Sequence, residues 1–154
     1  MQNKSVRISD NLDIITTIKY WERIMDIKFE NRIIDDFIID EKRERAKYML
    51  CSKKRYDFIW RITKDIIKNP YNELLTVSSW KDVAEILSFS SNEKCYVMSA
   101  FDKTIDGKIF ENYTALSNVV FHGVGLIFYY EKNVLYFEGA PENSKSFRCV
   151  ISNT

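Results

Sequence analysis

The sequence predicts an α+β fold, with a helix-rich N-terminal half packed on an antiparallel sheet formed by the C-terminal half. Two observations carry this prediction. Apolar residues recur at helical spacing in the first half, and from Cys95 onward the apolar runs become short and strand-like. With only four glycines and two prolines in 154 residues, and no linker or repeat, we expect one globular domain over residues 1–154.

The first helix is expected at about Asn11–Met25, after a flexible or edge-strand lead-in over residues 1–9. Asp10 is a suitable N-cap residue. One apolar face recurs at helical spacing and consists of Ile14, Ile18, Trp21 and Met25. We interpret this face as core packing. The following stretch, Asp26–Arg32, fits either a short strand or a loop.

A second helical pattern runs over Ile33–Asn69, and Pro70 stops it. A single helix of that length is uncommon in a globular domain, so we expect a break either near Asp40–Lys42 or around Ser52–Lys54. A short helix is expected from Trp80 to about Leu87, where Ser79 and Asp82 have the spacing of a capping box.

The C-terminal half is expected to supply the strands Cys95–Phe101, Val124–Tyr130, Val134–Glu138 and Phe147–Ile151. Asp106-Gly107 signals a turn, and Ile109–Phe121 fits a strand followed by a short helix. Glu131-Lys132-Asn133 is expected to join the central hairpin, with Asn133 in the left-handed conformation and Tyr130 facing Val134.

In that register both faces of the central hairpin are apolar. One face carries Ile127, Tyr129, Leu135 and Phe137, and the other carries Leu126, Phe128, Tyr130, Val134 and Tyr136. Two interpretations follow. Either helices and other parts of the chain cover both faces, or one aromatic face is partly open as a binding surface.

Charge is distributed unevenly along a chain whose net charge is only +1. Residues 40–68 contain ten basic and five acidic side chains, and residues 69–154 contain seven basic and ten acidic ones. The basic helical segment 42–68 is a candidate nucleic-acid surface, using Lys53, Lys54, Arg55, Arg61 and Lys64. A solvated helix face is the competing interpretation, and the near-neutral chain makes nucleic acid the weaker partner.

The acidic half suits a basic protein partner, because complementary charge speeds encounter and aromatic side chains supply anchors. The candidate binding residues are Asp102, Asp106, Glu111, Glu131, Glu138 and Glu142, with Tyr129, Tyr130 and Tyr136 as anchors. Ordinary solvated carboxylates are the alternative interpretation for each acid.

Catalytic and metal signatures are sparse. His122 is the only histidine, so a histidine-dependent mechanism has to use it, but the neighbouring glycines also fit a simple turn. Three widely spaced cysteines without a CxxC pair do not make a metal set, so we expect no metal and no cofactor. The apolar runs are too short to cross a membrane and no signal peptide is recognised, which predicts a cytoplasmic protein.

In general character the chain resembles the small cytoplasmic immunity proteins that neutralise bacterial toxins, including those of contact-dependent growth inhibition systems. The resemblance lies in a single compact domain, a sequence rich in Lys, Ile and Asn, no reaction centre, and an acidic half that contains the aromatic hairpin. It implies a non-enzymatic inhibitor that binds a toxin, typically a nuclease, and the acidic half of the chain favours a basic one. A nucleic-acid-associated regulator using segment 42–68 and a small enzyme using His122 are the alternatives.

Overall fold

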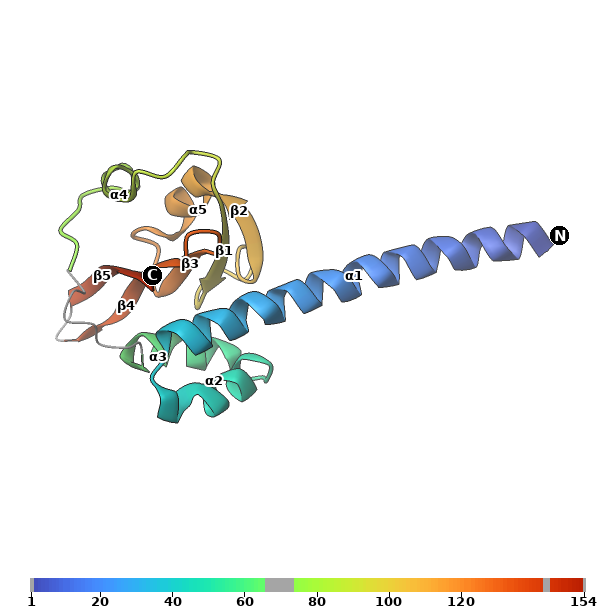
Figure 1. Cartoon of the computed structure of the whole chain (residues 1–154), viewed down its shortest axis with the longest axis horizontal. Coiled ribbons are helices and arrows are strands. Elements are labelled where there is room, and N and C mark those ends of the chain that lie inside the picture. Colours follow the sequence, from blue (N-terminus) through green and yellow to red (C-terminus); the bar gives the residue numbers. More distant parts are fainter. Residues whose placement is uncertain (1, 66–73, 143–144, 154) are drawn as a thin grey trace.

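The α+β fold predicted from the sequence is present in the computed structural model, with α1 to α3 in the first half of the chain and the whole sheet in the second (Figure 1). The structure describes residues 2–65, 74–142 and 145–153, and the side chains of residues 14–61, 74–139 and 147–153. Within these ranges, none of the helices combines the length and the apolarity that a membrane crossing needs.

The N-terminal half comprises α1 (Gln2–Phe37), the 3-10 turn η1 (Asp40–Lys42), α2 (Arg43–Leu50) and α3 (Arg55–Asp65). The C-terminal half comprises α4 (Trp80–Leu87), β1 (Lys94–Ser99), β2 (Lys108–Glu111), α5 (Asn112–Val119), β3 (Gly125–Tyr129), β4 (Val134–Glu142) and β5 (Lys145–Ser152). The strands form one antiparallel sheet in the order β2-β1-β3-β4-β5. All four predicted strands are present, and β4 runs on to Glu142.

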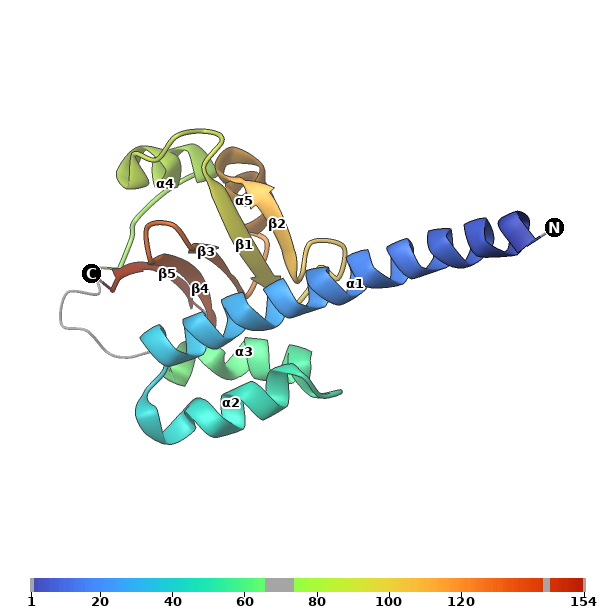
Figure 2. The same cartoon turned by 45° about the vertical axis from the view of Figure 1, so that its right-hand side comes forward.

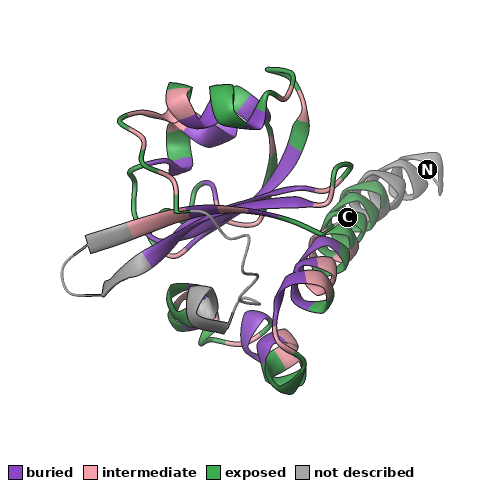
Figure 3. Cartoon of the chain, turned by 60° about the vertical axis from the view of Figure 1, so that its left-hand side comes forward, coloured by how far each residue is buried: buried purple, intermediate pink, exposed green. Residues whose placement is uncertain are grey.

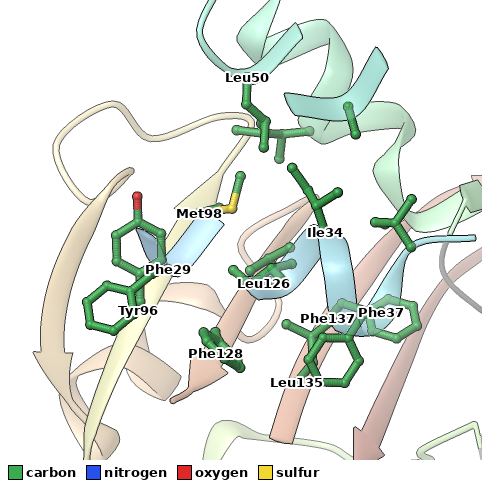
Figure 4. Close-up of a cluster of buried hydrophobic side chains, with 14 of the residues drawn as sticks. Phe29, Ile34, Phe37, Leu50, Tyr96, Met98, Leu126, Phe128, Leu135 and Phe137 are labelled. Atoms are coloured by element: carbon green, nitrogen blue, oxygen red, sulfur yellow. The ribbon is translucent and has the colours of Figure 1, made fainter. Parts of the chain in front are cut away.

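Helices cover the sheet on both faces, as its apolar central strands require. The C-terminal half of α1 lies with α2 and α3 on one side, and α4 and α5 lie on the other (Figures 1 and 2). The first layer packs Phe29, Ile33, Ile34 and Phe37 of α1 near Leu126, Phe128, Leu135 and Phe137 of the sheet (Figure 4). The second layer packs Leu116 and Val119 of α5 near Ile127, Tyr129 and Tyr136.

The helix α1 is continuous from Gln2 to Phe37. The helix predicted over Asn11–Met25 is therefore present, but its predicted bounds are wrong, as are the lead-in expected before it and the strand or loop expected at Asp26–Arg32. Glycine and proline are absent from this range, and Asp10 lies inside the helix instead of capping it. At about 1.5 Å per residue the helix is roughly 54 Å long. Its C-terminal half lies on the sheet, and its N-terminal half projects beyond it (Figures 1 and 2).

The predicted helical segment Ile33–Asn69 breaks at both of the places considered. The first break follows Phe37, where Ile39 is extended (φ −59°, ψ 143°) and η1 leads into α2. At the second, the Ser52 hydroxyl donates to the Met49 carbonyl at 2.8 Å and accepts from the Lys54 amide at 3.1 Å, in place of helical backbone bonds. The end of the predicted segment, residues 66–69, and Pro70 lie outside the described residues.

The short helix predicted at Trp80–Leu87 is α4, with the same bounds. Its start differs from the predicted capping box, because Ser79 makes no side-chain cap hydrogen bond. The Asp82 carboxylate instead accepts from the Ser78 amide at 2.8 Å and from the Ser78 hydroxyl at 3.0 Å. These bonds hold the pKa of Asp82 below its ordinary value. The strand and helix expected within Ile109–Phe121 are β2 and α5.

The β3–β4 hairpin is present, but its register differs by one residue from the prediction. Tyr129 pairs with Val134, where the sequence interpretation paired Tyr130 with Val134. The turn therefore spans residues 130–133, and the Lys132 amide donates to the Tyr129 carbonyl at 3.0 Å. Asn133 takes the predicted left-handed conformation (φ 51°).

This slip exchanges the two faces of β4, because neighbouring residues of a strand point to opposite sides. Tyr136 pairs with Ile127 and lies in the cluster under α4 and α5, whereas Leu135 and Phe137 lie with Phe128 in the cluster under α1 to α3. Both faces of the hairpin are covered, so the interpretation in which one aromatic face stays partly open is wrong.

Candidate functional site

The aromatic side chains predicted to anchor a partner belong mainly to the core. Tyr129 and Tyr136 are fully buried; Tyr129 donates its hydroxyl hydrogen to a side-chain oxygen of α5, and Tyr136 to Glu138, both at 2.7 Å. Burial raises the pKa of both hydroxyls. Tyr130 is half-buried and stacks on Phe29 of α1, with ring centroids 4.4 Å apart. A partner cannot reach Tyr129 or Tyr136 without opening the fold.

Two of the six acidic residues predicted to bind a partner lie inside the fold. Asp106 and Glu138 have buried carboxylates in ion pairs, with Arg55 Nε at 2.8 Å and with Arg148 Nε at 3.0 Å. These two carboxylates therefore belong to ion pairs inside the fold. Asp102, Glu111 and Glu131 are exposed, and the side chain of Glu142 lies outside those described.

The alternative sites also change when they are placed on the fold. Of the predicted nucleic-acid set, Arg55 is held by buried carboxylates, Lys53, Lys54 and Arg61 are exposed, and the side chain of Lys64 lies outside those described. His122 is exposed in the turn before β3. Over the described ranges, the structure brings together no group of three or more His, Cys, Asp or Glu that could hold a metal ion.

A row of large apolar side chains is exposed to solvent along the part of α1 that precedes its buried segment. We call it the α1 row, and it consists of Ile14, Ile18, Trp21 and Met25. Its exposed fractions range from 39% for Met25 to 58% for Trp21. Their helical spacing predicted correctly that these four residues share one helix face, but the prediction that this face packs in the core is wrong. Among the side chains of α1 that the structure describes, burial begins where the helix reaches the sheet, as with Phe29 and Ile33 (Figure 3).

A groove of about 640 Å³ lies between the α1 row and the β1–β2 hairpin. Its walls are Ile18, Trp21, Glu22, Met25 and Asp26 of α1 with Gly107, Lys108 and Ile109 across from them. A second hollow of about 380 Å³ shares Asp26 and Gly107 with the groove and reaches Glu30, Arg55 and Tyr96. Apolar walls with a few polar groups are typical of binding clefts.

The inner hollow ends at a buried network of ion pairs. Arg55 donates to both oxygens of Glu30, at 2.7 and 2.8 Å, and to both oxygens of Asp106, at 2.8 and 3.1 Å. The Tyr96 hydroxyl donates to Glu30 as well. Burial opposes the charge of Arg55, but the bonds to two carboxylates outweigh it and raise its pKa above the ordinary value. Arg55 therefore stays cationic, with its charge fully compensated.

Asp26 lines both hollows and, unlike Glu30 and Asp106, is not ion-paired within the described part of the chain. Among the described residues, no lysine or arginine forms an ion pair with its carboxylate. Partial burial and then the negative charge of Glu30 raise the pKa of Asp26 to about 6, although Arg55 acts in the opposite direction. A carboxylate in a cleft whose charge is disfavoured by its surroundings is typical of functional sites.

No local sequence pattern indicated this site. Arg55 and Asp106 are 51 positions apart, and no motif spacing indicates that they meet. The available signal was the helical spacing of the α1 row together with the uninterrupted helical sequence after it, which together favour one long helix.

The chain matches no known protein family, no curated protein and no solved structure, so the arguments for its function come from the site itself.

Proposed function

We propose that this protein is a non-enzymatic binding protein of the inhibitor or immunity type, and that it neutralises a basic toxin, such as a nuclease, in the cytoplasm through the groove along α1. The observation that carries the proposal is the α1 row. Exposed apolar side chains gathered on one face are characteristic of partner-binding surfaces, and Trp and Met are enriched where partners meet.

The geometry of α1 favours tight binding. The helix is held to the sheet by its buried C-terminal half and to α3 by the bonds between Glu30 and Arg55, so the row belongs to an element that is already ordered. A preformed surface loses little conformational freedom on binding, which leaves more of the contact energy for affinity. This placement replaces the acidic hairpin surface that the sequence indicated, since Tyr129, Tyr136, Asp106 and Glu138 are internal.

The rival functions have less support at the level of the site. Phosphate binding through segment 42–68 would have to proceed without Arg55, whose guanidinium is bonded to Glu30 and Asp106. An enzyme based on His122 would work from an exposed turn that lines neither hollow.

The test is growth protection. The proteins encoded beside this chain are expressed one at a time, and a product that arrests growth is co-expressed with the wild type and with a Trp21→Asp variant. We expect the wild type to restore growth and to bind the purified toxin, and the variant to lose both. Tyr48→Asp is the matched control, because Tyr48 is 74% exposed on α2, away from the groove. If no neighbouring product is neutralised, or if Trp21→Asp protects as well as the wild type, the proposal is wrong.

A further inference from the structure

We propose that the groove binds an apolar and basic segment of the partner protein, in which apolar side chains cover the α1 row and one lysine or arginine pairs with Asp26. This inference rests on the proposed function, because it specifies the chemistry of the partner at the same groove.

The position of Asp26 gives the first argument. It follows Met25 in the sequence, and it lines both the groove and the inner hollow. Glu22, one helical turn earlier, lines the groove too. A segment lying along Trp21 and Met25 would therefore have the Asp26 carboxylate beside it, at the point where the apolar wall gives way to the polar hollow.

Charge complementarity gives the second argument. The two hollows are lined by four acids, Glu22, Asp26, Glu30 and Asp106, and by three bases, Arg23, Arg55 and Lys108. The guanidinium of Arg55 is already shared between Glu30 and Asp106. A cationic side chain would supply the missing positive charge, whereas an anionic one would add a fifth carboxylate.

The state of Asp26 in the free protein gives the third argument. Its charge is disfavoured by partial burial and by Glu30, so the carboxylate lowers the stability of the unbound fold. Pairing with a cation from a partner would reverse this effect, since an opposite charge nearby favours the ionised form. A residue that lowers the stability of the free protein and gains a counter-charge on binding is expected at a recognition site.

The mixed charges beside the α1 row favour a protein segment over a lipid surface. Lys19 and Arg23 alternate with Glu22 and Asp26 along this part of α1. Helices that lie on anionic membranes carry predominantly basic residues beside the apolar face.

The experiment is a selection from a phage library of short random peptides, run in parallel on the wild type, Asp26→Asn and Trp21→Asp, each checked for folding by circular dichroism. We expect wild-type selections to share apolar positions with a lysine or arginine at a fixed spacing. Asp26→Asn should keep the apolar preference and lose the basic one, and Trp21→Asp should select no such sequence. The best wild-type peptide should bind Asp26→Asn about tenfold more weakly, and raising the salt from about 50 to about 300 mM should weaken its binding to the wild type alone.

The outcomes separate this inference from the function on which it rests. An apolar consensus that depends on Trp21 but lacks a basic position, or one that is unchanged in Asp26→Asn, overturns the inference and leaves the groove as a binding site. Selections that do not depend on Trp21 overturn both. A wild-type dimer in sedimentation that Trp21→Asp dissociates would assign the groove to a second copy of the chain, which also overturns the inference.

Discussion

Arg55 of α3 and Glu30 of α1 form a bidentate ion pair, in which Nη1 donates to Oε1 at 2.7 Å and Nη2 donates to Oε2 at 2.8 Å. The pair lies where α1 passes from solvent onto the sheet. Because the exposed and buried halves belong to one helix, this bond between α1 and α3 also fixes the position of the groove wall. Paired N–H donors facing both carboxylate oxygens constrain direction as well as distance.

Removing the cation of this network should destabilise the fold strongly. Arg55→Met leaves the Glu30 and Asp106 carboxylates, whose side chains are 9% and 5% exposed, without a counter-charge. Breaking a buried ion pair in this way typically costs about 3–5 kcal/mol. Urea unfolding followed by circular dichroism measures the loss. Arg61→Met, at an exposed position of the same helix, is the control and should change stability by less than about 0.5 kcal/mol. Equal effects of the two variants would contradict this account.

Asp26 should make stability fall as the pH rises. Its pKa in the folded protein is about 6, against an ordinary value of 3.8, so between these values the folded state holds the proton more tightly than the unfolded state does. The free energy of unfolding of Asp26→Asn should therefore match that of the wild type near about pH 3.5. Near about pH 7.5 it should be higher by on the order of 1 kcal/mol, because solvent screens the charge of this partly buried carboxylate.

The control for this pH experiment is Asp102, whose carboxylate accepts bonds from Thr104 that lower its pKa. Asp102→Asn should have the opposite sign, with stability lost relative to the wild type at neutral pH and regained on acidification. Melting temperatures measured across the pH range check both variants. A difference for Asp26→Asn that does not vary with pH would show that the carboxylate is not held in unfavourable surroundings.

Two aromatic residues of α1 should respond differently to truncation. Trp21→Ala removes a side chain that is 58% exposed and should change the free energy of unfolding by no more than about 0.5 kcal/mol. Phe29→Ala removes one that is 5% exposed in the core and should cost about 3–5 kcal/mol. Denaturant unfolding of both variants makes the comparison. If Trp21→Ala were as costly as Phe29→Ala, the α1 row would be covered in the free protein.

The pairing of Gly139 with Phe147 should not tolerate an added methyl group. A Cβ atom at Gly139 would lie 1.9 Å from Cζ of the Phe147 ring, so the ring would have to move. Gly139→Ala is expected to cost about 1–3 kcal/mol, as overpacking does. The cost should shrink when Phe147→Leu is added, and thermal unfolding of the single and double variants measures the difference. If Gly139→Ala costs as much stability in the presence of Phe147→Leu as in its absence, the steric clash does not involve the Phe147 ring.

Local patterns in the sequence predicted the α+β division, the strands and the short helix α4, because these depend on periodicity and turn residues. The hairpin register was missed by one residue. Turns of three and of four residues both suit Asn133, and the choice between them depends on how each face of the sheet packs with Tyr136 or Leu135.

The functional surface was harder to predict, because exposure is a property of the whole fold. The spacing of Ile14, Ile18, Trp21 and Met25 is identical for a core helix and for a binding helix, and only the length of α1 decides which it is. Likewise, Asp106 and Glu138 look like surface acids until their partners Arg55 and Arg148 are placed beside them.

The central claim is that the α1 row is the surface that a protein partner covers. Amide hydrogen exchange, measured on this protein alone and bound to the toxin that it neutralises, tests the claim most directly. We expect binding to slow exchange in residues 14–26 of α1 and in β2, which faces them across the groove, and to leave α2 unchanged. Slower exchange in α2, α3 or the β3–β4 turn, with residues 14–26 unaffected, would contradict it.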